Sequence, residues 1–170
     1  MEEVLFVDGY NIINAWPELK KLSKISLELA RQELINSMVE YSAYKGIEVF
    51  VVFDAFHVKD CASRIEEVKG VKVVFSKYGE TADHYIEKSV AKYVKSGRAV
   101  KVATSDWVEQ QVIMAQGAIR VSASELVEEL KRFKESVSEK IRSRQDDSNT
   151  LWDNISPEVL EKLKKMRNRN

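Results

Sequence analysis

The sequence VLFVDGYN, residues 4–11, decides the fold that we expect for this chain. An unbroken apolar run, residues 4–7, is followed at once by Asp8 and Gly9. A short run rich in β-branched and aromatic residues, ended by a glycine turn, is typical of a buried strand in a parallel sheet. Open α/β sheets carry their chemistry in the crevice at the carboxyl ends of their strands. Asp8 is therefore a first candidate site residue.

Four more apolar runs share this pattern, and stretches with helical spacing separate them. The expected strands are residues 4–7, 49–53, 71–75, 100–104 and 119–121. The expected helices are residues 27–44, 81–94, a helix that Asp106 and Glu109 begin as a capping-box-like pair, and 122–144. Asn14 to Pro17 is expected as a turn, and residues 55–69 as irregular or poorly defined helix. Alternating strands and helices predict an α/β fold, a parallel five-stranded sheet with helices on both faces.

The end of the chain differs in composition from the rest. Residues 145–150 are polar and are expected to form a linker, after which Ser156-Pro157 begins a last short helix. We therefore expect a domain of residues 1–145 and a basic helical tail of residues 146–170. Residues 131–170 hold 11 Lys or Arg against 7 Asp or Glu, whereas the first 130 hold 16 against 20. Contact with RNA and an ordinary solvated helix both remain open for the tail. Its basic residues near the end are Lys162, Lys164, Lys165, Arg167 and Arg169.

The composition, with 44% hydrophobic and 32% charged residues among 170, is that of a globular domain. No apolar run approaches the roughly 20 residues of a membrane helix. Because the expected first strand begins at residue 4, we expect no signal peptide. The one cysteine, Cys61, excludes a disulfide framework within the chain. These features predict a cytoplasmic protein, and they leave the oligomeric state open.

Acidic residues follow several of the expected strands. Asp8 follows the first strand, Asp54 the second and Asp106 the fourth, while Glu80 and Asp83 begin the helix after the third. Each has a simpler explanation by itself, as a turn residue, a strand end or a helix N-terminus. The carboxyl ends of parallel strands lie at one edge of the sheet, so all five are expected to share one crevice.

Such crowding favours a bound cation, because like charges about 4 Å apart repel by about 4 kcal/mol at an effective dielectric near 20. Oxygen ligands without His or Cys favour Mg²⁺ or Mn²⁺. The helix N-termini at Thr81 and Ser105 are expected to lower the carboxylate pKa values. Water attack on a phosphodiester fits such a site. Asn11, Thr104 and Ser105 are expected to position ligands by hydrogen bonds. Tyr10, Trp16 and Trp107 are candidates for stacking on bases. For Trp16 and Trp107, packing is the favoured expectation.

The motifs Asp8 to Asn11, Phe53-Asp54, Glu80 to Asp83 and Thr104 to Asp106 together resemble the NYN branch of the PIN-like nucleases, most closely its YacP-like group. The resemblance covers nearly the whole chain. It implies a three-layer α/β/α fold with strand order 3-2-1-4-5. It also implies a Mg²⁺ or Mn²⁺ site in which Asp8, Asp83 and Asp106 are the catalytic carboxylates, supported by Asp54 and Glu80. The implied activity is endoribonuclease cleavage of mRNA, with a ribosome as an implied partner.

Other classes fit less well. A receiver domain needs an acidic pair at the first strand and a lysine after the fifth, where this chain has Val7-Asp8 and Arg120 to Ser122. A haloacid-dehalogenase-like phosphatase needs an aspartate where Tyr10 stands. A DNA 5′-nuclease normally has further elements that grip DNA. The main alternative is a non-catalytic RNA- or ribosome-binding module that keeps the acidic pocket.

Overall fold

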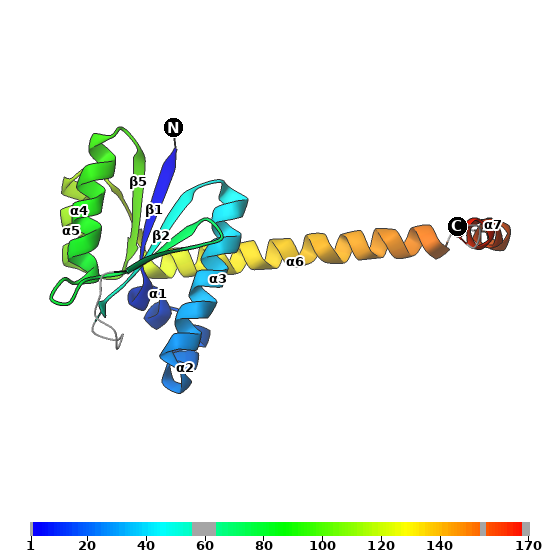
Figure 1. The fold of residues 1–170 in the computed structure, drawn as a ribbon, viewed down its shortest axis with the longest axis horizontal. Helices are drawn as coiled ribbons and strands as arrows, with labels where there is room; N and C mark the ends of the chain where they lie inside the picture. The colour runs from blue at the N-terminus through cyan, green and yellow to red at the C-terminus, as the bar shows by residue number, and fades with distance from the viewer. Residues whose placement is uncertain (1, 56–63, 154–155, 168–170) are drawn as a thin grey trace. The chain divides into compact units, whose positions relative to one another are not determined.

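The computed structural model describes residues 2–55, 64–153 and 156–167, and its ribbon is shown in Figure 1. Cys61 and Arg169 lie outside the described residues. The strands are β1 (Glu3–Asp8), β2 (Glu48–Phe53), β3 (Arg64–Val68), β4 (Val71–Phe75), β5 (Ala99–Thr104) and β6 (Ile119–Ser122). The helices are α1 (Gly9–Ala15), α2 (Pro17–Ile25), α3 (Leu27–Lys45), α4 (Ala82–Lys95), α5 (Trp107–Ala115), α6 (Ala123–Asp153) and α7 (Pro157–Arg167).

The strands form one sheet in the order β3-β4-β2-β1-β5-β6. All neighbouring strands are parallel except β3, which pairs antiparallel with β4 at the sheet edge. The five strands expected from the sequence therefore have the order 3-2-1-4-5, as the resemblance implied. The fold is mixed α/β as expected, with β3 as a sixth strand.

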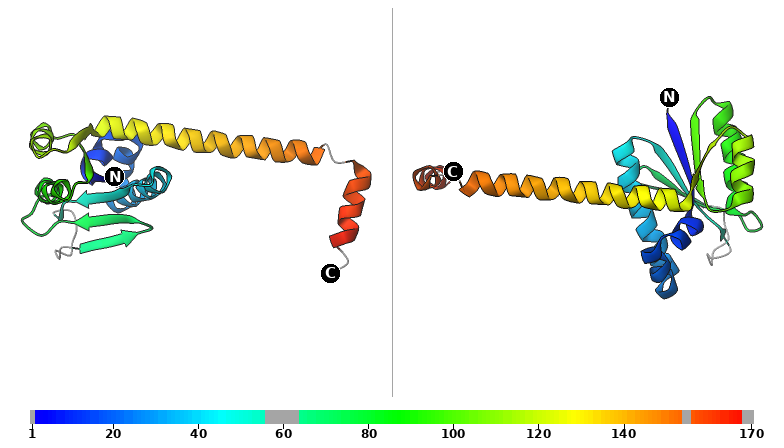
Figure 2. Two further views of the ribbon diagram at one scale, coloured as in Figure 1. Left: turned by 90° about the horizontal axis from the view of Figure 1, so that it is seen from above. Right: turned by 180° about the vertical axis from the view of Figure 1, so that it is seen from behind.

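Helices cover both faces of this sheet, which gives three layers (Figures 1 and 2). The helices α4 and α5 pack on one face, where Phe6 and Val102 meet Ile86 and Ile113 in a buried apolar cluster. The helices α1 and α3 contact the strands from the other face. Because β1 is buried on both faces, its apolar residues need no alternation with polar ones.

Several predicted helix ends are confirmed by their capping contacts. The Thr81 hydroxyl accepts the His84 N–H at 3.2 Å and begins α4. At the start of α6, Ser122 and Glu125 form the reciprocal contacts of a capping box, at 3.1 and 2.6 Å. Gly46 ends α3 with a left-handed φ of +67°. These polar contacts satisfy backbone groups that the helices leave unpaired.

Three expectations were wrong. Residues 64–68 are a strand, which the exposed and charged sequence Arg64 to Val68 concealed; its hairpin turn at Lys69 and Gly70 has two positive φ values. Of the turn expected at Asn14 to Pro17, Asn14 and Ala15 belong to α1 (Gly9–Ala15), and Pro17 begins α2 at its first position. The stretch 145–150 is not a linker, since α6 continues through it for 31 residues in all.

The chain divides into two units, residues 1–130 and 131–170. The first holds the sheet, its covering helices and the start of α6, whose Leu126 and Leu130 are buried. The second holds the rest of α6 together with α7. The expected division at residue 145 stays a prediction. Among the described residues, no helix is long and apolar enough to cross a membrane.

Candidate metal centre

The carboxyl edge of the sheet holds three acidic side chains in a cluster. Asp8 ends β1, Asp83 lies in the first turn of α4, and Glu109 lies in the first turn of α5. One carboxylate oxygen from each lies within 4.8 Å of the others. Asp8 and Glu109 are buried and Asp83 is partly buried. We call Asp8, Asp83 and Glu109 the acidic triad.

Asp8 lies at the carboxyl edge because the chain passes directly from β1 into α1 after it. The next residue, Gly9, lies so close to β2 that a Cβ there would lie 2.2 Å from the Phe53 ring, so the position requires glycine. Asp8 is the N-cap of α1, and its Oδ1 accepts the Asn11 N–H at 3.4 Å. The adjacent strand and helix therefore fix the Asp8 carboxylate together.

Asn11 connects this carboxylate to the end of β5. Its side-chain amide donates to Asp8 Oδ2 at 2.6 Å and to the Thr104 hydroxyl at 3.3 Å, and its carbonyl accepts a hydrogen bond from Ser105. The Thr104 hydroxyl also accepts the Asp106 N–H at 3.1 Å. Asn11 thus orients the Asp8 carboxylate, and Thr104 and Ser105 hold Asn11 in turn. That these three residues position ligands stays a prediction.

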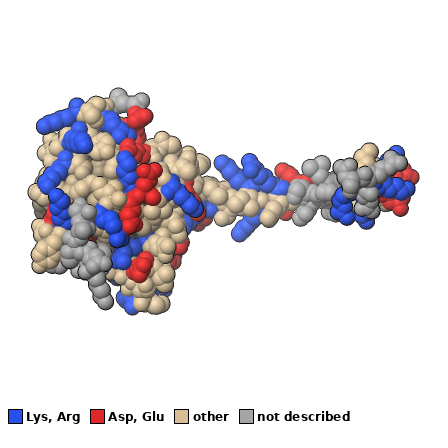
Figure 3. All heavy atoms as spheres, in the orientation of Figure 1, with Lys and Arg blue, Asp and Glu red and all other residues tan. Residues whose placement is uncertain are grey.

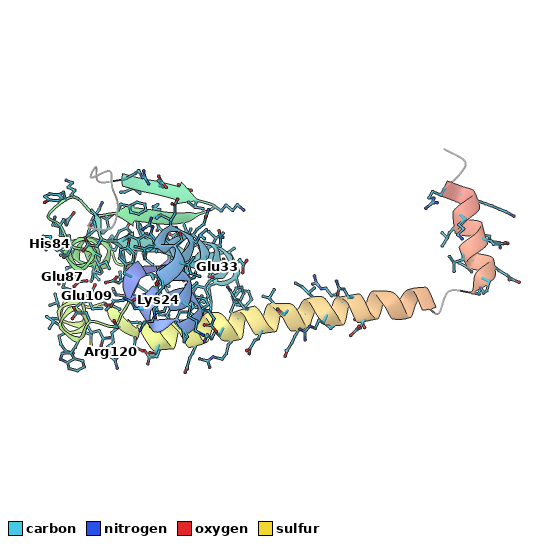
Figure 4. The ribbon with its side chains drawn as sticks, turned by 90° about the horizontal axis from the view of Figure 1, so that it is seen from below. Lys24, Glu33, His84, Glu87, Glu109 and Arg120 are labelled. Carbon is cyan, nitrogen blue, oxygen red and sulfur yellow. The ribbon has the colours of Figure 1, made fainter. Side chains whose placement is uncertain are left out.

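Glu109 has the least ordinary environment of the three. Its side chain is 2% exposed, and both of its carboxylate oxygens lack a hydrogen-bond partner among the residues that the structure describes. Figure 4, which looks onto this edge, shows Glu109 of α5 and Glu87 of α4 between the two helices. A buried polar group without a partner costs about 1–3 kcal/mol, and more when it is charged. The site is therefore complete only with a further ligand or with added protons.

The pKa values point the same way. Burial raises the pKa of Asp8 to about 7; the Asn11 hydrogen bond lowers it, and the Asp83 carboxylate raises it further. Burial also raises the pKa of Glu109 to about 8; the nearby Thr104 opposes this shift, and the charges of Asp83 and Asp8 add to it. The expected lowering by helix N-termini is therefore wrong for Asp8, because the loss of hydration outweighs it.

A hard divalent cation fits this donor set. The available donor atoms are carboxylate oxygens, and both oxygens of Glu109 lack a hydrogen-bond partner among the described residues. A bound cation would offset the repulsion between the carboxylates and would coordinate these oxygens. The group is assembled from three different elements, so it forms only in the folded chain.

The other predicted acids are not members of the triad. Asp106 is the N-cap of α5, where its Oδ1 accepts the Val108 and Glu109 N–H groups at 2.8 and 3.3 Å. Glu80 pairs with Lys88 at 2.8 Å, and this contact lowers its pKa. Asp54 follows β2 and acts electrostatically on Tyr10.

Glu109 is the candidate ligand that the sequence interpretation missed. The sequence predicts a capping-box-like pair of Asp106 and Glu109. One of its two hydrogen bonds forms, since the Asp106 carboxylate accepts the Glu109 N–H. The Glu109 side chain is buried instead of returning to the start of the helix. One signal was available. Glu109 lies one turn before the buried Ile113, and a charged residue on the apolar stripe of a helix needs a partner in the core.

Tyr10 is half-buried at the same edge. Its hydroxyl accepts a hydrogen bond from Arg31 at 3.2 Å, and its ring lies 5.1 Å from that of Phe53. Burial raises its pKa. Contact of Tyr10 with RNA stays a prediction.

A mostly parallel sheet with an acidic cluster at its carboxyl edge is compatible with a nuclease-type α/β domain. Comparison with known sequences identifies the family to which the chain belongs. The sequence model of the YacP-like NYN domain matches residues 5–168, and the chain belongs to that family. It is 41% identical over 165 residues to the protein YacP of Bacillus subtilis (strain 168), covering 97% of this chain and 96% of that one.

Solved structures agree with this assignment. The chain resembles the crystal structure of Rae1 (YacP) from Bacillus subtilis with a TM-score of 0.74 and 40% identity, covering 98% of this chain and 95% of that one. The crystal structure of a mutant of the same Bacillus subtilis protein gives a TM-score of 0.71 and 42% identity, over 84% of this chain and 82% of that one. The fold and the family are thus shown by sequence and structure together.

Proposed function

We propose that this protein is a metal-dependent endoribonuclease that hydrolyses phosphodiester bonds of mRNA. The observation that carries the proposal is the acidic triad, in which Asp8, Asp83 and the partnerless Glu109 meet within 4.8 Å. Membership of the NYN family, whose nuclease-like domains act on RNA, supports the same class of reaction.

Mg²⁺ or Mn²⁺ is the proposed cofactor, held by the triad. When bound, such an ion lowers the pKa of water and offsets the negative charge that develops on a phosphodiester. Asp8 is kept in orientation by Asn11, and Glu109 presents two oxygens that no neighbouring donor occupies among the described residues. Asp106 is proposed as a further catalytic carboxylate beside the triad, with Asp54 and Glu80 as supporting residues. Thr104 and Ser105 are proposed to contact the phosphate.

RNA recognition is proposed to involve the basic residues of the second unit. In Figure 3, basic side chains cover much of the described part of α6, and α7 carries Lys162, Lys164, Lys165 and Arg167. A ribosome that presents the mRNA, in the cytoplasm, is the proposed setting. Removal of residues 151–170 should weaken RNA binding and reduce its salt dependence, because fewer phosphate contacts release fewer counterions. An unchanged slope of affinity against salt would assign this segment no role in RNA binding.

The test of the activity is cleavage of a labelled mRNA, free and on ribosomes, with Mn²⁺ or with a chelator. We expect cleavage by the wild type with Mn²⁺ and none with chelator. Asp8→Asn should lower the rate by at least about 100-fold, since removing even an outer partner of a metal ligand typically costs 10–100-fold. Glu40→Gln, a change of an exposed acid on α3, is the matched control and should cleave normally.

Two outcomes would contradict the proposal. Equal cleavage by wild type and Asp8→Asn would show that the acids do not act in the reaction. Absence of cleavage on free and ribosome-bound mRNA, with RNA binding retained, would instead favour a non-catalytic RNA-binding module.

A further inference from the structure

Trp107 is the first residue of α5, and its side chain is 68% exposed. The packing that we favoured for Trp107 over stacking on bases was wrong, whereas Trp16 is buried as expected. Exposed apolar residues are common on protein surfaces, so exposure alone indicates little. The position of Trp107 is more informative, because it directly follows Asp106 and stands two residues before Glu109.

The helix directs Trp107 and Glu109 to different sides of the same turn. Residues two apart in an α-helix do not face each other. Glu109 is therefore buried in the triad, while Trp107 presents its ring to solvent at the same end of α5. The exposed ring and the acidic site thus share the carboxyl edge of the sheet.

A second exposed aromatic residue lies at this edge. Tyr78, in the segment that joins β4 to α4, is 74% exposed, and the neighbouring Lys77 is exposed as well. In the sheet, β2 and β1 lie between β4 and β5, and three strand spacings of about 4.8 Å amount to about 14 Å. Tyr78 and Trp107 therefore follow strands on either side of β1, at whose end Asp8 lies.

We infer that Trp107 and Tyr78 stack on unpaired bases of a single-stranded RNA whose phosphate lies at the acidic triad. This inference rests on the proposed function and adds the class of substrate. Aromatic faces beside a basic residue are the usual means by which proteins hold single strands without reading their sequence. Bases inside a duplex are already stacked and are not available to these rings.

The arrangement fits a single strand better than a protein partner. A stable protein interface buries about 800 Å² on each side around a continuous apolar centre. Trp107 instead begins α5, and Tyr78 lies in the separate segment that joins β4 to α4, with Lys77 beside it. As positioning residues, the two rings would align the strand so that the phosphate between two splayed bases meets Asp8.

The test is binding of a fluorescein-labelled oligoribonucleotide to the full-length chain in the presence of EDTA, so that cleavage plays no part. Loss of one stacking contact should weaken binding about five- to 150-fold for Trp107→Ala. Trp107→Phe should restore most of the affinity, and Trp107→Leu should not. The slope of affinity against salt should stay unchanged, since it counts phosphate contacts.

Matched controls distinguish stacking from a general effect. Met114→Ala changes another exposed apolar residue of α5, 48% exposed, and should bind as the wild type does. Tyr78→Ala should repeat the loss seen for Trp107→Ala. Because both rings are mostly exposed, the melting temperatures of these variants should equal that of the wild type. The same RNA annealed to its complement should bind all variants equally.

Several results would overturn the inference. These are wild-type affinity in both aromatic variants, wild-type affinity in Trp107→Leu, or an equal loss on single-stranded and duplex RNA. The proposed function is tested separately by cleavage. Active cleavage with unaffected binding would refute only the stacking, and stacking without cleavage would refute only the proposed reaction.

Discussion

The acids at the amino edge of the sheet and the acidic triad at its carboxyl edge have opposite environments. At the amino edge, Glu48 accepts hydrogen bonds from Lys72 at 2.5 Å and from Arg98 at 2.6 Å, and Glu3 pairs with Lys101 at 3.1 Å. At the carboxyl edge, no ion pair among the described residues includes a member of the acidic triad. The fold can therefore supply basic partners to its acids, and it does so only away from the triad.

The pKa values follow this difference. Burial by itself would raise the pKa of Glu48, but the hydrogen bonds of Lys72 and Arg98 outweigh it and lower the pKa. Glu109 is more deeply buried and its pKa rises to about 8. Acids that only stabilise the fold are neutralised by neighbouring side chains, whereas the triad leaves that role to protons or to a bound cation. The contrast makes the triad the candidate functional site of the fold.

The largest expected effect is on activity. Asp83→Asn should lower RNA cleavage by at least about 100-fold, because a carboxylate of the triad is lost. The same change should leave the melting temperature of the metal-free protein equal or higher, since it removes like-charge repulsion. Cleavage assays and thermal melts with EDTA measure the two effects. A strong fall in melting temperature would instead make Asp83 a structural residue, like those of the amino edge.

A matched pair of substitutions should change stability in opposite directions. Glu48→Gln removes two ion pairs that are partly exposed, and should cost about 1 kcal/mol, or a few degrees in melting temperature. Glu109→Gln removes a buried charge without a partner, so at pH 8 and without metal the melting temperature should rise or stay equal. If both variants are destabilised to the same extent, the two edges do not differ as we describe.

The raised pKa values of Asp8 and Glu109 should determine how the stability of the metal-free protein changes with pH. Asp8 and Glu109 have folded-state pKa values of about 7 and 8, above their ordinary values of 3.8 and 4.5. At pH values between the ordinary and the raised pKa of each group, that carboxyl group is protonated in the folded protein and ionised in the unfolded chain. The free energy of unfolding of the metal-free protein should therefore fall as the pH rises from about 5 to 8, by at most about 1.4 kcal/mol per pH unit for each proton.

Urea denaturation at several pH values in EDTA checks this expectation. The lowered pKa of Glu48 acts with the opposite sign, but only below about pH 4.5, so it does not interfere. Glu109→Gln should flatten the dependence. A stability that rises from pH 5 to 8, or an identical slope in the variant, would contradict the raised pKa values.

The sequence predicted the parts of this molecule that local patterns specify. Apolar runs located five strands, and because parallel strands end at one edge, it followed that Asp8 and Asp83 would lie close together. The cap residues Thr81 and Ser122 marked helix starts for the same local reason. Asp8 and Asp83 could be placed at one edge because the alternation of strands and helices indicates that the strands run parallel.

What the sequence did not predict depends on tertiary contacts. The strand β3 is exposed and charged, so it lacks the apolar pattern of a buried strand. The continuation of α6 through residues 145–150 has no apolar stripe that would indicate a helix. Glu109 and Asp106 both stand near the start of one helix, and only the packing of α5 against α4 decides which of the two side chains enters the core.

The most direct test of the central claim is a crystal structure of the protein soaked in Mn²⁺, with the ion located by anomalous scattering. Our account predicts an ion in contact with carboxylate oxygens of Asp8, Asp83 and Glu109, at distances of about 2.1 Å. It also predicts no ion at Glu48, where basic side chains already provide the charge. Absence of an ion from the triad, or separation of Asp8 from Glu109 in the crystal, would contradict it.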